Sequence, residues 1–491
     1  MYSGIKVHAN VKLYMSESVP AQAKMPVPPP RRHEEFSRRV KQFCDVATED
    51  DEERGFHSHG HTLQELFDVR YGHLAHVVDL VVYPRSHEDV VGLVALAGEL
   101  NVVLIPFGGG TNVTQAVLVP SEPRTVVSVD MSKMNHVLAV NRANMTALVQ
   151  TGICGTDLEK ELGRYGVTCG HEPDSFEFST LGGWISTRAS GMKKNTYGNI
   201  EDIVITMKIV TPIGVFEKIT QGPRVSNGPD INHVVFGHEG LLGIITEALI
   251  KVKQLPEKKA YGSFVFPNFE FGTKFMYEMG VDGIRPSSVR LVDNAQFQFA
   301  MAIKPATESK FTAFLDRVKK YYLLKIKQFD PNKMCVATLV YEGPASVVKL
   351  QQAQVGAVAR KNHGMYAGAE NGIRGYFLTY MIAYIRDFAL DYHVVAESFE
   401  TSVPYDKAAK MIEMVQRRIE VSCAAKGVTK PPFVSSRITQ LYDSGCAVYV
   451  YFGFYYKGLK NPAEIYSQIE DEAREEVLKW GGSLSHHHGI P

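Results

Sequence analysis

Apolar residues occur along the chain with two different spacings, which predict strands and helices. The largely apolar segment at residues 77–83, interrupted only by Asp79, is typical of a strand. Ser86 and the acidic residues after it predict the start of an amphipathic helix over residues 90–100. A second apolar run at residues 102–105 predicts another buried strand. The N-terminal half therefore contains strand, helix and strand in succession.

Similar segments continue to the end of the chain. In the first half they predict strands at 125–129, 147–150, 203–210 and 244–252 and a helix at 156–165. In the second half they predict helices at 310–324, 345–362, 405–426 and 462–478 and strands at 336–341 and 446–456. This mixture predicts an α+β fold class. A length of 491 residues predicts two or three domains.

Changes in composition suggest where the domains begin and end. The proline cluster near residue 28 and the weak apolar periodicity around it predict a mobile leader over residues 1–54. We expect a first domain at 55–255, a second at 256–460, and a C-terminal helix and loop at 461–491. Internal repeats are not evident.

Composition and charge exclude several classes of protein. Lys and Arg total 53, as do Asp and Glu, so the overall charge gives no reason to expect a nucleic-acid partner. The six cysteines show no CxxC spacing, which argues against a zinc site or a disulfide framework. Neither a long apolar run nor a signal peptide is visible, so we expect a protein that is neither secreted nor membrane-spanning.

Three glycine-rich loops in the first domain indicate a phosphate-binding groove. Three consecutive glycines at 108–110 follow the strand at 102–105, and the N–H groups of such a loop can converge on a pyrophosphate. Residues 174–191 are dense in glycine and hydroxyl groups, and residues 237–245 place more glycines before a strand. The G-x-G-x-x-G fingerprint of NAD sites is absent, which favours a flavin over a nicotinamide.

In this order, the loops resemble those of the vanillyl-alcohol-oxidase type, or PCMH type, of FAD-binding domain. The resemblance covers residues 77–252 and implies such a domain, with a cap (substrate) domain of mixed sheet and helices after it. It also implies FAD that is bound without a covalent link. The residues assigned to the cofactor are Pro106, Phe107, Gly108, Gly109, Gly110, Thr111, Asn112, Asp174, Ser175, Phe176, Glu177, Phe178, Ser179, Thr180, Thr187, Arg188, Ala189, Ser190, Glu239, Gly240, Leu241, Leu242, Gly243, Ile244 and Ile245.

Longer strings resemble a narrower family, the alkyldihydroxyacetonephosphate synthases. The matching strings are residues 171–195, 197–202, 286–294, 397–401 and 482–489. That family exchanges the acyl chain of 1-acyl-dihydroxyacetone phosphate for a long-chain fatty alcohol and so forms the ether bond of ether lipids, the plasmalogen precursors. The resemblance implies the same reaction here, through a covalent adduct at flavin N5 and without net redox change.

The resemblance also implies roles for individual residues. The matching residues are Tyr449, His486, His487, His488 and Arg290 for catalysis and Arg386 and Ser398 for substrate binding. A tyrosine beside the flavin suits the acid/base role that proton exchange at C1 requires. Guanidinium groups offer planar forks for phosphate oxygens. We expect no metal ion, because three adjacent histidines cannot easily all face one ion.

The residues alone leave ordinary alternatives open. Tyr449 shares a strand face with Tyr451 and Gly453, and without the resemblance a packed sheet tyrosine would be the commoner interpretation. Arg290 and Arg386 would more often be surface or ion-pair arginines. The alternative function is an FAD-dependent hydroxy-acid or phenol dehydrogenase or oxidase on the same fold. A catalytically inert member of the family, kept for scaffolding, is a third interpretation.

Expectations about partners and location rest on the resemblance. The substrates, acyl-dihydroxyacetone phosphate and a long-chain fatty alcohol, imply peripheral attachment to the lumenal face of a peroxisomal membrane, and a homodimer is a further expectation. Nucleic acid is not an expected partner. No targeting signal is visible in the chain, and relatives continue beyond its last residue, so we expect a C-terminally truncated chain.

Overall fold

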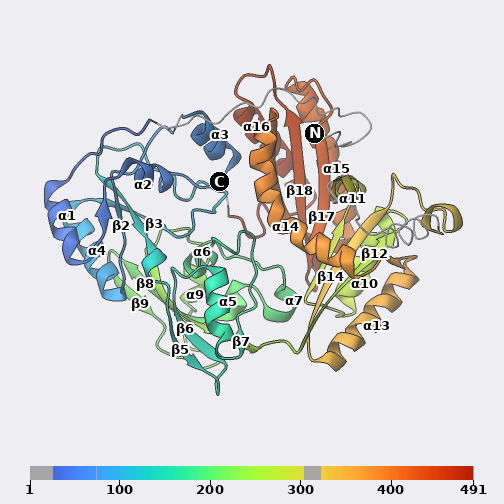
Figure 1. The fold of residues 1–491 in the computed structure, drawn as a ribbon, viewed down its shortest axis with the longest axis horizontal. Coiled ribbons are helices and arrows are strands. Elements are labelled where there is room, and N and C mark those ends of the chain that lie inside the picture. Colours follow the sequence, from blue (N-terminus) through green and yellow to red (C-terminus); the bar gives the residue numbers. More distant parts are fainter. Residues whose placement is uncertain (1–25, 73, 303–321, 490–491) are drawn as a thin grey trace, which may run out of the picture. The chain divides into compact units, whose positions relative to one another are not determined.

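The computed structural model describes residues 26–72, 74–302 and 322–489, with only the backbone described for residue 322 and residues 378–385. These residues form two compact units (Figure 1). The N-terminal unit contains residues 26–255 together with residues 487–489, and the C-terminal unit contains residues 256–486. The division after residue 255 lies where the sequence analysis separates its first two domains. The last helix of the chain belongs to the C-terminal unit, although the sequence analysis set it apart.

A four-stranded sheet forms one part of the N-terminal unit. Its order is β1 (Ala47–Thr48), β2 (Leu80–Val82), β4 (Val126–Asp130) and β3 (Val103–Phe107), with β2 and β3 parallel to β4. Helix α4 (His87–Leu100) connects β2 to β3, and Ser86 and Asp89 form a capping box at its start. Its apolar face packs into one core with these strands. The predicted succession of strand, helix and strand is confirmed.

An antiparallel five-stranded sheet forms the other part. Its order is β5 (Val137–Asn141), β6 (Thr146–Gln150), β10 (Ile244–Lys251), β8 (Val204–Thr211) and β9 (Gly214–Glu217). Helices α5 (Gly155–Gly163) and α6 (Leu181–Ser186) add Leu158, Leu162 and Trp184 to its core. The shorter elements are α3 (Leu63–Tyr71), α7 (Lys194–Tyr197), α8 (Ile200–Ile203), α9 (Asn232–Val235) and the strand pair β7 (Val167–Thr168) and β11 (Lys253–Gln254).

The segment before β2 is folded from residue 34, which differs from the mobile leader expected over residues 1–54. It contains α1 (Glu34–Arg39), the 3-10 turn η1 (Val40–Gln42), β1 and α2 (Asp51–Phe56). Phe36, Val40 and Cys44 are buried in the same core as α4. Burial of apolar side chains against a distant helix holds this segment in place, and the local sequence does not reveal that contact.

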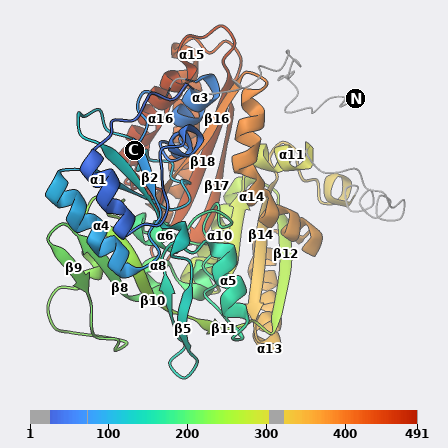
Figure 2. The ribbon, with the colours of Figure 1, turned by 60° about the vertical axis from the view of Figure 1, so that its left-hand side comes forward.

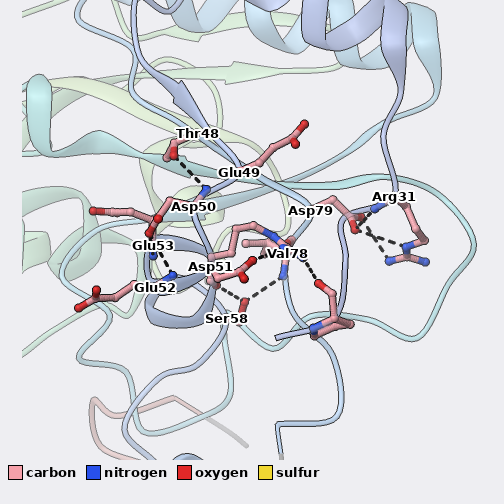
Figure 3. A network of polar contacts seen from close by, with 12 residues as sticks. Arg31, Thr48, Glu49, Asp50, Asp51, Glu52, Glu53, Ser58, Val78 and Asp79 are labelled. Carbon is pink, nitrogen blue, oxygen red and sulfur yellow. Dashed lines mark hydrogen bonds and ion pairs between the residues drawn. The ribbon is translucent and has the colours of Figure 1, made fainter. Parts of the chain in front are cut away.

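Polar contacts add to this attachment (Figure 3). Asp50 Oδ1 accepts hydrogen bonds from the main-chain N–H groups of Glu52 at 3.0 Å and Glu53 at 3.1 Å, and so caps α2. The main-chain N–H of Arg31 donates to Asp79 Oδ1 at 2.8 Å, and the guanidinium Nη2 lies 3.4 Å from Asp79 Oδ2. A carboxylate as buried as that of Asp79 needs such partners.

The C-terminal unit is built on an antiparallel seven-stranded sheet. Its order is β15 (Met365–Tyr366), β12 (Lys258–Phe266), β14 (Cys335–Gly343), β13 (Ser288–Val292), β17 (Phe433–Leu441), β18 (Gly445–Tyr455) and β16 (Val394–Pro404). Strands β17 and β18 run side by side in both ribbon views (Figures 1 and 2), and β16 lies beside β18 (Figure 2). The predicted strands at 336–341 and 446–456 are confirmed as β14 and β18.

The helices of this unit are α10 (Phe269–Val281), α11 (Asn294–Ala302), α13 (Ala345–Lys361), α14 (Ala369–Leu390), α15 (Tyr405–Ala425) and α16 (Pro462–Lys479), with a single π-helical turn at Tyr322–Ile326. The helices predicted at 345–362, 405–426 and 462–478 are confirmed as α13, α15 and α16, whereas α10, α11 and α14 were not predicted. The helix predicted at 310–324 lies largely outside the described residues. Within the described ranges no helix combines the length and the apolar character needed to cross a membrane.

The two faces of β18 have different surroundings. The ring of Phe452 stacks on that of Tyr466 in α16 at 4.0 Å, so this residue and its neighbours at alternate positions face the core beneath α16. Tyr449 and Tyr451 point to the opposite face, where their rings stack at 6.0 Å. The predicted common face of these two tyrosines is confirmed.

Helix α14 packs closely on the far end of the same sheet. A Cβ added at Gly372 would meet the carbonyl oxygen of Gly262 in β12 at 2.4 Å, and one at Gly375 would meet the Thr338 side chain in β14 at 2.6 Å. Glycine at these two positions therefore lets the helix backbone approach the strands.

Candidate active site

The three glycine-rich loops of the N-terminal unit meet one another. A Cβ added at Gly108 would lie 2.5 Å from the Thr180 hydroxyl, and one at Gly109 would lie 2.1 Å from the carbonyl oxygen of Phe178. A Cβ at Gly240 would lie 3.5 Å from the ring of Pro106. Loops separated by more than 60 residues in the sequence thus form one cradle, in which only glycine fits at the closest approach.

Backbone conformation supports the role of these loops as hydrogen-bond donors. Gly110 has φ +65° and Gly240 has φ +85°, which L side chains rarely adopt. Such turns direct successive N–H groups towards one side, as an anionic phosphate requires. Thr180 caps α6 by accepting a hydrogen bond from Gly183 N at 3.2 Å, so the end of the second loop is fixed to the start of a helix. The arrangement fits the pyrophosphate of FAD.

Other residues predicted to bind the cofactor take several positions. The Ser190 hydroxyl donates to Asn199 Oδ1 at 2.6 Å, and the Glu239 carboxylate accepts from Thr114 Oγ1 at 2.9 Å. Ile244 and Ile245 begin β10 and their side chains are buried in core clusters, so only their backbone is available to a ligand. The Leu241 side chain is 90% exposed. Among the residues predicted to bind the cofactor, the glycines and the hydroxyl-bearing residues therefore meet at the cradle, whereas these apolar side chains are either buried in the core or exposed.

His171 is a site residue that the sequence analysis did not single out, although it lies in a matching string. Its ring is buried beside Trp184, with the ring centroids 5.1 Å apart. Burial lowers the pKa of His171 to about 3, with a smaller contribution from His487. Neither ring nitrogen has a hydrogen-bond partner among the described residues. A neutral, unpaired imidazole in the interior is a further sign that a ligand belongs here.

His487 and His488 lie in the same unit as this cradle. Their rings are 4.7 Å apart, and one ligand atom from each lies with a carboxylate oxygen of Asp174 in a group no wider than 4.8 Å. Two of the three adjacent histidines thus converge on one point together with Asp174. The group could bind a metal ion, or an oxygen atom of a substrate.

The C-terminal unit carries the predicted acid/base tyrosine in the middle of three strands. Tyr449 of β18 lies opposite Glu400 of β16 and opposite Arg437 of β17. Directly paired residues of antiparallel strands point to the same face, so these three side chains form one row. All three are buried. Neither Glu400 nor Arg437 was predicted. The pairing of Glu400 with Tyr449 joins strands that are far apart in the sequence, and Arg437 lies in β17, a strand that the sequence analysis did not predict.

Glu400 fixes the start of the histidine loop. Its carboxylate accepts hydrogen bonds from the main-chain N–H of His486 at 2.5 Å and from the hydroxyl of Ser485 at 2.7 Å. The His486 ring lies 2.6 Å from the Tyr442 hydroxyl through Nε2. Glu400 and Tyr442 thus hold His486. The charge-assisted hydrogen bond to Glu400 sets the position of His486 relative to Tyr449.

The two predicted arginines occupy different settings. The guanidinium carbon of Arg290 lies 5.4 Å from the ring centroid of Tyr376 in α14. Arg386 Nη1 donates to Glu397 Oε2 in a buried ion pair. Burial raises the pKa of Glu397, and the positive charge of Arg386 opposes that shift. Both arginines are buried, which excludes the surface interpretation of either.

Two smaller side chains lie beside the row at Tyr449. Ser398 of β16 lies opposite Tyr451, and so shares its face. Ser435 of β17 also lies opposite Tyr451, and its hydroxyl is fully buried without a hydrogen-bond partner in the described part of the chain. An unpaired buried hydroxyl on this face fits a polar ligand that completes it.

Comparisons with known proteins agree with this geometry. The family described as FAD binding domain matches residues 78–220, and the family described as FAD linked oxidases, C-terminal domain, matches residues 255–490. The Caenorhabditis elegans alkyldihydroxyacetonephosphate synthase is 46% identical over 88% of this chain and 72% of its own length. The chain belongs to the alkyldihydroxyacetonephosphate synthase family.

Other members of the alkyldihydroxyacetonephosphate synthase family match almost the whole chain. The Dictyostelium discoideum protein is 37% identical over 94% of this chain and 76% of its own length. A solved structure of an alkyldihydroxyacetonephosphate synthase superposes with a TM-score of 0.88 at 35% identity, covering 98% of this chain and 86% of that structure. The predicted FAD-binding and cap architecture is confirmed, and FAD is the cofactor of this fold.

Proposed function

We propose that this protein exchanges the acyl chain of 1-acyl-dihydroxyacetone phosphate for a long-chain fatty alcohol and so forms an ether bond. The observation that carries the proposal is the row formed by Glu400, Tyr449 and Arg437 in a chain that also has the glycine cradle for FAD. Membership of the alkyldihydroxyacetonephosphate synthase family supports it. The exchange changes no oxidation state overall.

The chemistry divides between the cofactor and the protein. When bound, FAD supplies reversible covalent capture of the substrate carbon, so that one difficult substitution becomes two easier steps. Tyr449 takes the proton from C1 and returns it after the exchange. Its buried position excludes bulk water from the proton transfer.

Cationic groups hold the phosphorylated substrate in this proposal. Arg386 and Arg290 are buried guanidinium groups that suit phosphate or carboxylate oxygens, and Ser398 adds a hydroxyl on the same sheet face as Tyr451. The pair His487 and His488 binds or deprotonates the incoming alcohol, since neutral imidazole is a base of suitable strength.

The proposal extends to the surroundings of the enzyme. Both substrates carry long alkyl chains, so we propose peripheral attachment to the lumenal face of a peroxisomal membrane, and a homodimer as the assembled form. Flotation of the purified protein with phosphatidylcholine vesicles tests the attachment, sedimentation equilibrium tests the dimer, and co-fractionation with a peroxisomal matrix marker tests the location.

The activity itself is tested with labelled hexadecanol and palmitoyl-dihydroxyacetone phosphate in FAD-replete protein. We expect label in alkyl-dihydroxyacetone phosphate and equimolar release of palmitate. Anaerobic addition of D-lactate should leave the flavin oxidised, whereas bleaching by lactate would favour the dehydrogenase alternative. The Tyr449→Phe variant should bind FAD and lose at least roughly 100-fold in exchange rate. Tyr455→Phe is the control, because Tyr455 lies on the same strand and its ring contacts Lys430.

A further inference from the structure

Arg437 occupies an unusual place for a charged side chain. It lies in β17, the strand between β13 and β18, and is 5% exposed. Its guanidinium carbon is 4.8 Å from the ring centroid of Tyr449 and 4.9 Å from that of Tyr451. The cation therefore lies over both rings of the stacked pair at almost equal distance. Burial of a guanidinium is costly, so an apolar side chain would be the ordinary residue at a site with only a packing role.

We propose that Arg437 is a positioning residue that orients the Tyr449 ring and stabilises its phenolate, so that Tyr449 acts as a base near neutral pH. This inference rests on the proposed function for the identity of the proton that is moved. The phenolate oxygen takes the C1 proton and becomes a phenol, while the electron pair stays on C1 in conjugation with the C2 carbonyl. The proton returns to C1 when the exchange is complete.

The physical reason is the difference between two interactions of the same cation. A guanidinium attracts the neutral tyrosine ring only through the ring quadrupole. It attracts the phenolate through a full opposite charge, which is a stronger interaction at this separation. The ionised form therefore gains more from Arg437 than the neutral form does. An opposite charge this close typically lowers the pKa of an acid by about one to three units.

Other charged groups around Tyr449 have to be weighed against this effect. Glu400 of β16 opposes ionisation, but its carboxylate already accepts hydrogen bonds from Ser485 and His486 of the loop after α16. Arg290 lies on β13, the strand next to β17, and its positive charge favours ionisation of Tyr449 as that of Arg437 does.

Two further groups of the unit have partners of their own. Arg386 of α14 is paired with Glu397. Tyr451 of β18 is itself covered by Arg437. The guanidinium of Arg437, at 4.8 Å from the ring centroid, is thus the charge that the structure places directly over the Tyr449 ring.

The first test uses the holoenzyme and does not depend on activity. The tyrosinate absorption of wild-type protein minus that of Tyr449→Phe, recorded against pH, isolates the ionisation of this one tyrosine. We expect a midpoint roughly one pH unit or more below the ordinary tyrosine value of about 10. A midpoint at or above about 10 overturns the inference.

The second test uses the pH dependence of the exchange rate. In Arg437→Gln the rising limb should move upwards by roughly one pH unit, with about tenfold slower exchange at pH 7. Arg437→Lys retains the charge, and its limb should stay near that of the wild type. Arg417→Gln is the control, because Arg417 is an exposed arginine of α15.

The outcomes separate the inference from the proposed function. A wild-type protein that makes no alkyl-dihydroxyacetone phosphate contradicts the proposed function, and the tyrosinate titration still decides the inference. An Arg437→Gln protein that is slower but keeps the wild-type pH profile assigns Arg437 a packing role only. If Arg437→Gln does not fold, the wild-type titration and the Arg437→Lys profile carry the test.

Discussion

The glycine cradle allows a quantitative test through Gly109→Ala. The added methyl would lie 2.1 Å from the Phe178 carbonyl oxygen, which belongs to the backbone and cannot rotate away. The two loops would have to separate by roughly 1 Å to restore ordinary contact. Overpacking of this kind costs about 1–3 kcal/mol. Because Gly109 has no positive φ, the steric contact alone accounts for the effect.

The expected result is weaker FAD binding with an intact fold. We assign this free-energy cost to the FAD-bound state. Since about 1.4 kcal/mol corresponds to a factor of ten in affinity, the Kd for FAD should rise roughly 10- to 100-fold. Quenching of flavin fluorescence during titration of the apoprotein measures this Kd, and thermal unfolding of the apoprotein reports the fold.

The matched control is Gly98→Ala. Gly98 is exposed within α4, and an added Cβ would meet nothing within 4 Å. This change should leave the Kd for FAD unaltered and stabilise the protein by up to about 1 kcal/mol, because alanine favours a helix. A Gly109→Ala protein that binds FAD within twofold of the wild type would contradict the contact between the two loops.

Three further changes probe the C-terminal unit. Glu400→Gln leaves one acceptor oxygen for the His486 loop and should lower the exchange rate about tenfold at unchanged FAD content, whereas an unchanged rate would show that the carboxylate does not position the loop. Arg386→Lys keeps a charge near Glu397 but not the planar fork, so the KM for acyl-dihydroxyacetone phosphate should rise about tenfold with little change in kcat; an unaltered KM would remove Arg386 from substrate binding. Burial raises the pKa of Asp293 to about 6, so the native state holds this proton more tightly than the unfolded chain does. Protonated Asp293 therefore contributes about 3 kcal/mol to the free energy of unfolding. This contribution is complete below about pH 4 and is lost as the pH rises through about 6. Asp293→Asn should abolish that part of the pH dependence in urea unfolding, and a curve parallel to the wild type would contradict it.

The local sequence determined most of the secondary structure of this protein. Helix α4 begins where Ser86 and Asp89 predict it, because a capping box is satisfied by residues three apart. Strand β18 follows the aromatic run at its predicted place, and the period of two puts Tyr449 and Tyr451 on one face. Signals of this kind depend only on near neighbours in the chain.

Identification of the cofactor and the reaction also came from the sequence, through its motifs. The glycines at 108–110 and 240 carry their meaning locally, since a missing side chain and a positive φ are properties of single residues. The strings at residues 171–195, around Arg290 and around the histidines indicated the family, which the comparisons then confirmed.

Only the tertiary structure decided which distant residues meet. Glu400 joins Tyr449 through the pairing of β16 with β18, two strands far apart in the chain, and nothing near Glu400 in the sequence indicates that register. Phe36 and Val40 are ordered because α4 covers them, although their own segment has a weak pattern. Propensity and motif act over a few residues, whereas burial and charge act through space, and the site of this protein depends on both.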